Sequence, residues 1–242
     1  MSWNQSQLTK LKEDVSTFGV AIDEEQLHQF IKFYELLVEW NRFMNLTAIT
    51  EFDAVCKKHF LDSISLCKAI DCTKKYNVID IGTGAGFPGI PLKIAFPNLK
   101  ITLLDSLGKR VKFLNTVITE LGLKEIEAIH GRAEDFAKPE QLREKFDLCV
   151  SRAVANLSIL SEYCLPYVKV DGYFISYKSE KISDEIKMSE TAIQILGGVV
   201  YDQKEFSLPN SNIYRNLCMI KKISHTPKKY PRKAGIPSKE PL

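Results

Sequence analysis

The first seventy residues repeat apolar positions at intervals of three and four, which is the spacing of amphipathic helices. The first such segment runs from Leu8 to Phe18. A second is expected to begin after Asp23, because an acid followed three residues later by glutamine forms a capping box. A third is expected from Thr50. The pattern therefore predicts three helices ahead of residue 73.

From residue 76 short apolar runs alternate with helical segments, which predicts a parallel sheet with helices on both faces. The expected strands are Val78–Ile81, Ile101–Leu104, Ile126–Ile129, Leu148–Val150 and Tyr173–Ser176. The helices between and after them are expected at 91–95, 109–121, 156–167 and 183–196. Two final apolar runs, 199–206 and 216–223, are joined by a short loop and must be antiparallel.

This order predicts an α/β fold of the class I S-adenosylmethionine-dependent methyltransferase type. Its sheet is Rossmann-like, mostly parallel, with an antiparallel C-terminal strand, and here it follows an N-terminal helical extension. A dinucleotide-binding half-sheet would more often end in another strand–helix unit. We divide the chain into a helical region, residues 1–72, a sheet domain, residues 73–224, and a C-terminal tail, residues 225–242.

The net charge of +3 is unevenly distributed. Residues 221–242 hold seven Lys and Arg and one acid, so the rest of the chain is slightly acidic. A basic, proline-containing end on an acidic body indicates a polyanionic partner, although a merely solubilising tail is the alternative. The candidate RNA contacts in this tail are Lys228, Lys229, Arg232 and Lys233.

The composition is that of an ordinary globular chain of 242 residues, 45% of them hydrophobic. No apolar run approaches the roughly 20 residues needed to cross a bilayer, and the polar start lacks the order of a secretory signal. The six cysteines contain no Cys-x-x-Cys pair, and the four histidines are scattered, so no metal site is expected. We expect a monomeric cytoplasmic protein with reduced thiols.

Residues 78–92 carry four glycines and two prolines behind an apolar run, and they fit two cofactor patterns. One is the dinucleotide pattern Gly-x-Gly-x-x-Gly from residue 84. The other is Asp80-x-Gly82-x-Gly84-x-Gly86, typical of S-adenosylmethionine sites. The prolines at 88 and 91 remove backbone N–H donors where a pyrophosphate would bind. S-adenosylmethionine has no phosphate, so the loop favours it.

Acids at the strand ends extend this cofactor site. Asp80 can face the cofactor's ammonium group, although it could instead cap the glycine turn. Asp105 ends the second strand, where a ribose diol would donate to it, in either kind of cofactor. After the third strand, the Ala133 N–H could bind an adenine ring nitrogen and Glu134 its exocyclic amine, with Asp135 as a possible substitute for Glu134.

The fourth strand ends in Cys149-Val-Ser-Arg-Ala-Val154, nearest the expected position of the transferred methyl group. The motifs of amino-group and cytosine C5 methylation are missing, and Cys149 is expected to be structural. This favours an acceptor such as guanine N7, which needs no general base. Arg152 would then position the cofactor carboxylate, a phosphate or guanine O6, although it could instead pair with an acid at the sheet edge.

Three polar residues, His59, Asp62 and Ser63, lie close together on the third predicted helix. Without an oxyanion loop beside them, packing or RNA contact is favoured over a catalytic set.

The chain resembles a known family, the bacterial small-subunit (16S) ribosomal RNA guanine-N7 methyltransferases called RsmG or GidB. The resemblance runs nearly end to end. It is carried by the glycine loop and by the segments Asn41–Thr47, His59–Ser63, Asp105–Arg110, Arg132–Glu134, Ser151–Val154 and Thr226–Lys233. It departs at Ser176–Ser179, where relatives are expected to have Lys-Gly, and this weakens the case for Lys178 as an RNA or active-site contact.

The resemblance implies methyl transfer from S-adenosylmethionine to N7 of a guanine in small-subunit ribosomal RNA. The sequence leaves open whether this RNA is free or part of an assembling small subunit. It adds Phe87 to the cofactor site and supports four positions already proposed. The full candidate set is Asp80, Gly82, Gly84, Gly86, Phe87, Asp105, Ala133, Glu134 and Arg152. The alternatives are a nicotinamide-dependent oxidoreductase, which shares the glycines and Asp105, and a non-catalytic RNA-binding module.

Overall fold

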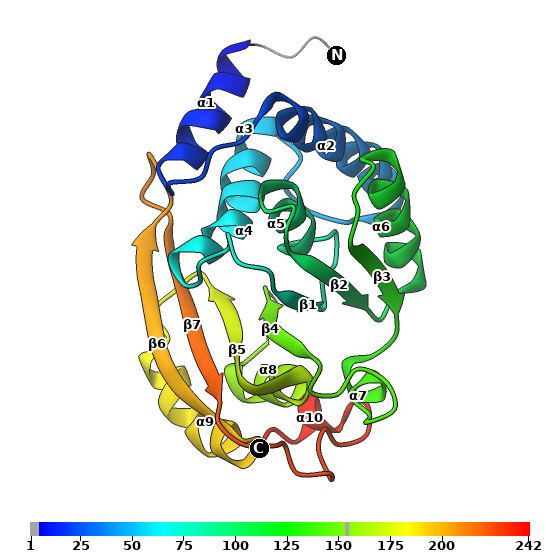
Figure 1. Ribbon diagram of the computed structural model, residues 1–242, viewed down its shortest axis with the longest axis vertical. Helices are drawn as coiled ribbons and strands as arrows, with labels where there is room; N and C mark the ends of the chain where they lie inside the picture. The colour runs from blue at the N-terminus through cyan, green and yellow to red at the C-terminus, as the bar shows by residue number, and fades with distance from the viewer. Residues whose placement is uncertain (1–4, 153–154) are drawn as a thin grey trace.

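The computed structural model describes residues 5–152 and 155–242. Its centre is a seven-stranded sheet of order β3-β2-β1-β4-β5-β7-β6, with helices on both faces (Figure 1). The strands are β1 (Asn77–Ile81), β2 (Lys100–Asp105), β3 (Ile126–His130), β4 (Phe146–Ser151), β5 (Val168–Lys178), β6 (Gly198–Ser207) and β7 (Tyr214–Lys222). Strands β1 to β5 are parallel, and β7 is antiparallel to β5 and β6. The predicted fold and all seven predicted strands are confirmed.

The central strands β1, β2 and β4 are buried because their successive side chains enter different cores. On one face lie Val78 and Leu103, and on the other lie Ile79 and Leu104. Strand β1 pairs with β2 on one side and with β4 on the other. The chain therefore leaves β1 in one direction and returns to β4 in the other. Such a reversal opens a crevice at the carboxyl ends of the two strands, where ligands bind in open α/β sheets.

The first face is covered by helices from the N-terminal region and the first half of the sheet domain. They are α1 (Gln5–Ser16), α2 (Glu24–Met44), α3 (Phe52–Val55), α4 (Asp62–Ile64), α5 (Gly89–Ala95) and α6 (Gly108–Glu120). A π-helical turn, η1 (Cys56–Leu61), joins α3 to α4, and a 3₁₀ turn, η2 (Ser65–Lys68), follows. Apolar residues of these helices share one core with the sheet.

The helix starts test the predicted caps. The capping box at Asp23 is confirmed, with its carboxylate accepting from the Gln26 N–H at 2.8 Å and Gln26 accepting in return at 2.9 Å. The third helix, predicted to start from Thr50, has its N-cap one residue later. Glu51 caps α3 instead, because its longer carboxylate accepts from the N–H groups of Asp53 and Ala54.

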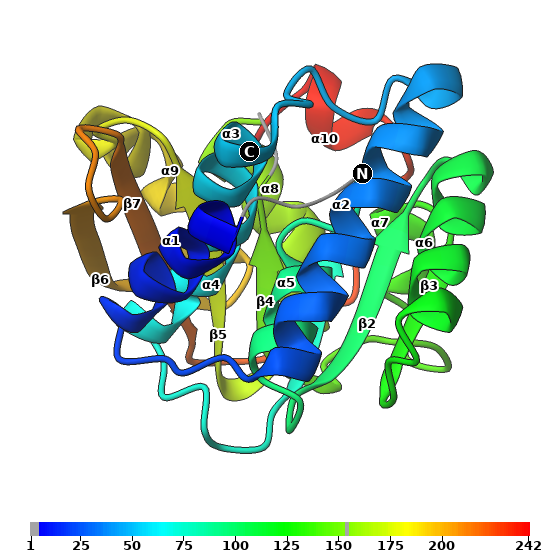
Figure 2. The ribbon, with the colours of Figure 1, turned by 90° about the horizontal axis from the view of Figure 1, so that it is seen from above.

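The second face is covered by α7 (Ala133–Phe136), α8 (Leu157–Cys164), α9 (Ser183–Ile195) and α10 (Ile236–Lys239), with a 3₁₀ turn, η3 (Leu165–Tyr167), after α8. The four-residue helices α7 and α10 were not predicted, because so short a helix shows no periodicity. The residues after β7 pack against this face, with α10 beside α7 and α8 (Figures 1 and 2).

Among the described residues, no helix is both long and apolar enough to cross a membrane. Within the same ranges, no group of three or more His, Cys, Asp or Glu is placed to hold a metal ion. All six cysteines are free thiols, and five of them are buried.

Candidate active site

Asp80 accepts hydrogen bonds from residues at both ends of the glycine loop. The carboxylate is fully buried at the end of β1, and its Oδ2 accepts from Thr83 Oγ1 at 2.6 Å and from the Gly89 N–H at 2.9 Å. Gly89 has to be small, because a Cβ there would lie 2.2 Å from Leu103 Cδ2. Helix α5 begins at Gly89, two residues before the expected start. Pro91 fits there because N–H groups of a helix's first turn have no intrahelical acceptor.

The other oxygen of Asp80 is left without a partner. Its Oδ1 is buried and accepts no hydrogen bond from residues that the structure describes. Burial raises the pKa of Asp80 to about 6, and the donors Thr83 and Gly89 oppose this rise. The capping interpretation of Asp80 therefore accounts for one oxygen, while the second has no hydrogen-bond donor among the described residues.

A cavity of about 360 Å³ opens at the carboxyl ends of β1, β2 and β3. Three of the candidate cofactor residues line it, Gly82, Ala133 and Glu134. Gly82 has φ +70°, and a Cβ at that position would meet no atom within 4 Å. The left-handed backbone and the open space together explain why glycine stands here.

Asp105 links the second strand to the glycine loop. It is 2% exposed, and its Oδ2 accepts from the Gly84 N–H at 2.9 Å while Oδ1 accepts from the Leu107 N–H at 2.9 Å. Gly84 and Gly86 both have positive φ, and their turn brings the loop onto this carboxylate. Asp105 is thus held at the edge of the cavity lined by its neighbours Leu104 and Ser106.

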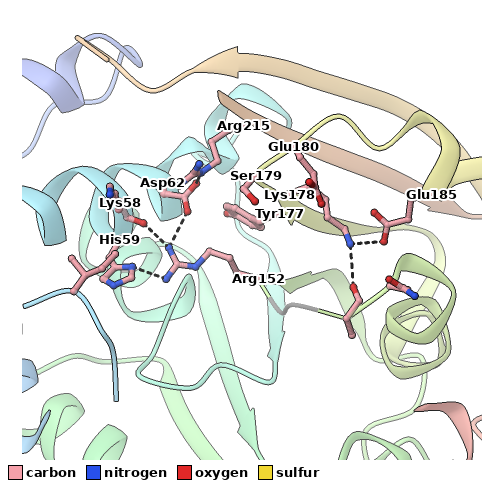
Figure 3. A pocket seen from close by; sticks show the side chains of 13 residues that line it. Lys58, His59, Asp62, Arg152, Tyr177, Lys178, Ser179, Glu180, Glu185 and Arg215 are labelled. Atoms are coloured by element: carbon pink, nitrogen blue, oxygen red, sulfur yellow. Dashed lines mark hydrogen bonds and ion pairs between the residues drawn. The ribbon is translucent and has the colours of Figure 1, made fainter. Parts of the chain in front are cut away.

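Arg152 lies at the centre of a second cluster, at the end of β4 (Figure 3). Its Nη1 donates to Asp62 Oδ2 at 3.0 Å and to the Lys58 carbonyl at 3.1 Å, and its Nη2 lies 3.1 Å from His59 Nδ1. The guanidinium stacks over the Phe87 ring at 4.9 Å. Arg152 thus pairs with an acid, as the alternative interpretation expected. Its contacts also bring Phe87 next to the His59–Ser63 motif.

His59 is held neutral inside this cluster. Burial, followed by the positive charge of Arg152, lowers its pKa to about 3. Because Arg152 donates to Nδ1, the ring proton belongs on Nε2, which lies 3.0 Å from Thr47 Oγ1. The ring also stacks on Phe87, with centroids 4.5 Å apart. His59 therefore has no nitrogen free to serve as a general base.

A second cavity, of about 390 Å³, lies beside this cluster at the ends of β4 and β5. Its walls include His59, Asp62, Arg152, Lys178, Glu185 and Arg215 (Figure 3). Lys178 donates to Glu185 Oε1 at 2.7 Å and to the Ala155 carbonyl at 3.1 Å. The candidate Lys178 is thus in the cavity wall with its charge already paired. Ala153 and Val154, the end of a motif singled out in the sequence, lie outside the described residues.

Two contributors were missed by sequence reasoning. Arg215 of β7 donates from Nε to Asp62 Oδ1 at 2.7 Å, and Gly235 donates from its N–H to Glu134 Oε1 at 2.9 Å. In each of these two pairs the residues are more than a hundred positions apart in the chain, and no local sequence pattern connects them. The expectation that Cys149 is structural agrees with its place inside β4, fully buried, where burial raises its thiol pKa.

The tail candidates separate into two groups. Lys228, Lys229 and Lys233 are exposed to solvent. Arg232 instead pairs with the buried Glu162 of α8, with Nη2 2.7 Å from Oε2.

Known structures share this fold. The Bacillus subtilis YcgJ protein is 14% identical, with a TM-score of 0.53 over 69% of this chain and 100% of that one. TYW2 of M. jannaschii, solved in complex with AdoMet, is 15% identical, with a TM-score of 0.51 over 62% of this chain and 71% of that one. At such identities the likeness establishes the fold, which is the one predicted.

Close relatives establish the family. A family model described as rRNA small subunit methyltransferase G, or GidB, matches residues 26–216. Proteins named ribosomal RNA small subunit methyltransferase G are 53% identical in Lachnoclostridium phytofermentans, over 95% of both chains, and 50% identical in Exiguobacterium sibiricum, over 99% of both. All residues that line the two cavities fall within the matched range except Gly235 and Ser238. The chain belongs to the rRNA small subunit methyltransferase G family.

Proposed function

We propose that this protein transfers a methyl group from S-adenosylmethionine to N7 of one guanine in small-subunit ribosomal RNA. The observation that carries the proposal is the arrangement of two cavities at one edge of the sheet, in a chain of this family. One cavity follows the ends of β1 to β3 and has the residues expected of a nucleoside site. The other surrounds Arg152, and its histidine, His59, has both ring nitrogens engaged.

The first cavity suits the cofactor, which when bound supplies an electrophilic methyl group on a sulfonium. Asp80 Oδ1, buried and without a described partner, would accept from its ammonium. Gly82 leaves room for it, and Asp105 would accept from the ribose hydroxyls. The Ala133 N–H and the Glu134 carboxylate would bind the adenine.

The cluster around Arg152 suits an acceptor that is already nucleophilic. Guanine N7 has a lone pair and needs no proton removed, so positioning decides the rate. His59 is held neutral with both nitrogens engaged, and the Cys149 thiol is buried with a raised pKa. Arg152, fixed by Asp62 and Phe87, would direct its guanidinium to the cofactor carboxylate or to guanine O6. Its role in this proposal is positioning.

The RNA would approach over the exposed lysines. Lys228, Lys229 and Lys233 are available for phosphate contacts, and Lys178 lines the second cavity. Arg232 is the weaker candidate, because its charge is paired with Glu162. We further propose that the protein acts as a monomer in the cytoplasm, on free RNA or on an assembling small subunit.

A labelling experiment tests the function. The purified chain is incubated with methyl-labelled S-adenosylmethionine and either small subunits or their RNA, and the labelled nucleoside is identified after digestion. We expect a single N7-methylguanosine. Label at another atom would contradict the proposed substrate, and stabilisation of the protein by NAD but not by S-adenosylmethionine would contradict the proposed cofactor.

A further inference from the structure

The C-terminal segment reaches the cavity at the ends of β1 to β3. Gly235 and Ser238 line this cavity together with Gly82, Ala133 and Glu134. Figure 2 shows α10, in red, at the edge of the molecule toward which the strand β2 points. A segment predicted to be a flanking tail therefore forms part of the wall of the candidate cofactor site.

Buried hydrogen bonds and an ion pair hold the C-terminal segment against the rest of the protein. Arg232 donates from Nε and Nη2 to the carboxylate of Glu162, at 3.0 and 2.7 Å, and its backbone N–H donates to the same carboxylate at 2.7 Å. Glu162 is only 1% exposed. Arg143 donates to the carbonyls of Thr226 and Tyr230, and the Tyr230 ring is buried. Such paired and buried groups hold the backbone in one position.

The best-defined contact that the segment makes in the cavity is with Glu134. The Gly235 N–H donates to Oε1 at 2.9 Å, which fixes one carboxylate oxygen. In the described part of the chain, no residue donates a hydrogen bond to the other oxygen, Oε2. A carboxylate held by one oxygen presents the second in a defined direction, and an amino group is the natural donor to it.

We propose that residues 231–240 form the wall of the nucleobase subsite and, through the Gly235 N–H, orient Glu134 toward the exocyclic amine of adenine. This inference rests on the proposed function, which makes the ligand an adenosyl cofactor. It assigns the segment a role in selecting the base of the cofactor, apart from any contact with RNA. The two roles use different residues, since Arg232 points inward whereas Lys233 is exposed.

The test compares two ligands that differ at the exocyclic group and at N1, which accepts a hydrogen bond in adenine and carries a proton in hypoxanthine. S-adenosylhomocysteine has the amine, and S-inosylhomocysteine has an oxygen there. Their dissociation constants are measured by calorimetry for the unaltered full chain, for Arg232→Ala, for a chain ending at Tyr230, and for the control Lys233→Ala. Lys233→Ala removes the same charge from the adjacent residue but leaves the Glu162 pair intact.

We expect the unaltered chain and Lys233→Ala to prefer the adenine ligand at least tenfold, because a hydrogen bond to a charged group is lost with inosine. The shortened chain should bind the adenine ligand at least tenfold more weakly and lose most of the preference. Arg232→Ala keeps the whole segment, and it should lower the affinity for the adenine ligand and the preference for it in the same direction. If the shortened chain does not fold, Arg232→Ala alone provides the test.

Unchanged affinity and unchanged base preference in Arg232→Ala, with the segment shown by faster tryptic cleavage to be released, would overturn the inference. So would an unaltered chain that binds both ligands equally well. If the unaltered chain bound neither ligand, the proposed function itself would be contradicted. The outcomes for the two proposals are therefore distinct.

Discussion

Arg152 at the end of β4 donates to Asp62 at a distance of 3.0 Å, across ninety residues of sequence. The other oxygen of Asp62 accepts from Arg215 of β7 at 2.7 Å. The side chains of Asp62, Arg152 and Arg215 are only 5, 16 and 13% exposed. One carboxylate therefore ties two sheet strands to the helical segment that precedes the sheet, and it sets the position of the guanidinium in the candidate active site.

Replacing Asp62 by Ala should destabilise the protein and slow methyl transfer. The change leaves two largely buried guanidinium groups without their shared partner, and breaking a buried pair in this way costs about 3 kcal/mol or more. Urea unfolding should show this loss. Single-turnover methyl transfer at saturating cofactor should fall more than tenfold, because Arg152 is no longer positioned.

The matched control is Asp202→Ala. Asp202 pairs with Lys204, but their side chains are 39 and 41% exposed, so its removal should cost less than about 1 kcal/mol. It should also leave the rate of methyl transfer unchanged. Equal behaviour of the two variants would show that the Asp62 cluster neither stabilises the fold nor positions Arg152.

Gly82→Ala should weaken cofactor binding more than it weakens the fold. Gly82 has φ +70° and Gly122 has φ +62°, and at both residues an added Cβ would have no atom within 4 Å. An Ala at either residue should therefore cost about 1 kcal/mol through backbone strain. Only Gly82 lines the cavity. Calorimetry with S-adenosylhomocysteine should show at least a tenfold loss for Gly82→Ala and none for Gly122→Ala, and equal affinities would remove Gly82 from the site.

Asp80 should make both stability and cofactor binding depend on pH. Its pKa in the folded protein is about 6, above its ordinary value of 3.8, because the carboxyl is buried. The folded state thus prefers the protonated form, and this contribution to stability is present below about pH 4 and lost as the pH rises through 6. Asp80→Asn should lack this loss. Its free energy of unfolding, measured from unfolding curves, should therefore rise relative to that of the unaltered chain between pH 4 and 7.

Binding of the cofactor should have the opposite dependence on pH. An ammonium favours the ionised carboxylate, so affinity for S-adenosylhomocysteine should increase as the pH rises through 6 and the group loses its proton. Calorimetry in buffers of different ionisation enthalpy should detect proton release near pH 6. A profile that is identical in Asp80→Asn would show that Asp80 does not face the ammonium.

The sheet was predictable because its information is local. Each strand is an apolar run of a few residues, and the intervening helices have their own period, so the order of elements determines a parallel sheet with a terminal antiparallel pair. The ends of β1 and β2 could be chosen as a ligand site for the same reason, since the carboxyl ends of parallel strands share one edge. Asp80 and Asp105 were found from their places at the ends of the first two strands.

The contacts that complete the site were not predictable, because they depend on distant groups without a signature. Gly235 acts through its backbone N–H, which almost every residue has. In the sequence, Arg232 resembles its basic neighbours, and only the fold places the buried Glu162 beside it. His59 and Asp62 were recognised as a set, but their relation to Arg152 requires the β4 end to meet η1 and α4.

The exposed lysines of the C-terminal segment should account for part of the salt dependence of RNA binding. Each phosphate contact contributes about 0.7 to 0.9 to the slope of log affinity against log salt. Replacing Lys228, Lys229 and Lys233 together by Ala should therefore reduce the slope by about 2 to 3, as measured by filter binding over a range of salt concentrations. Arg232→Ala should leave the slope nearly unchanged, because its charge is already neutralised by Glu162.

The control for this prediction removes three other exposed lysines, Lys74, Lys75 and Lys100. They lie just before β1 and at the start of β2, so they occupy the amino edge of the sheet, opposite the two cavities. Their replacement lowers the net charge by the same amount and should not alter the slope. If both triple variants lowered it equally, the lysines would act only through the overall charge of the protein, and the RNA would not be bound by the C-terminal segment.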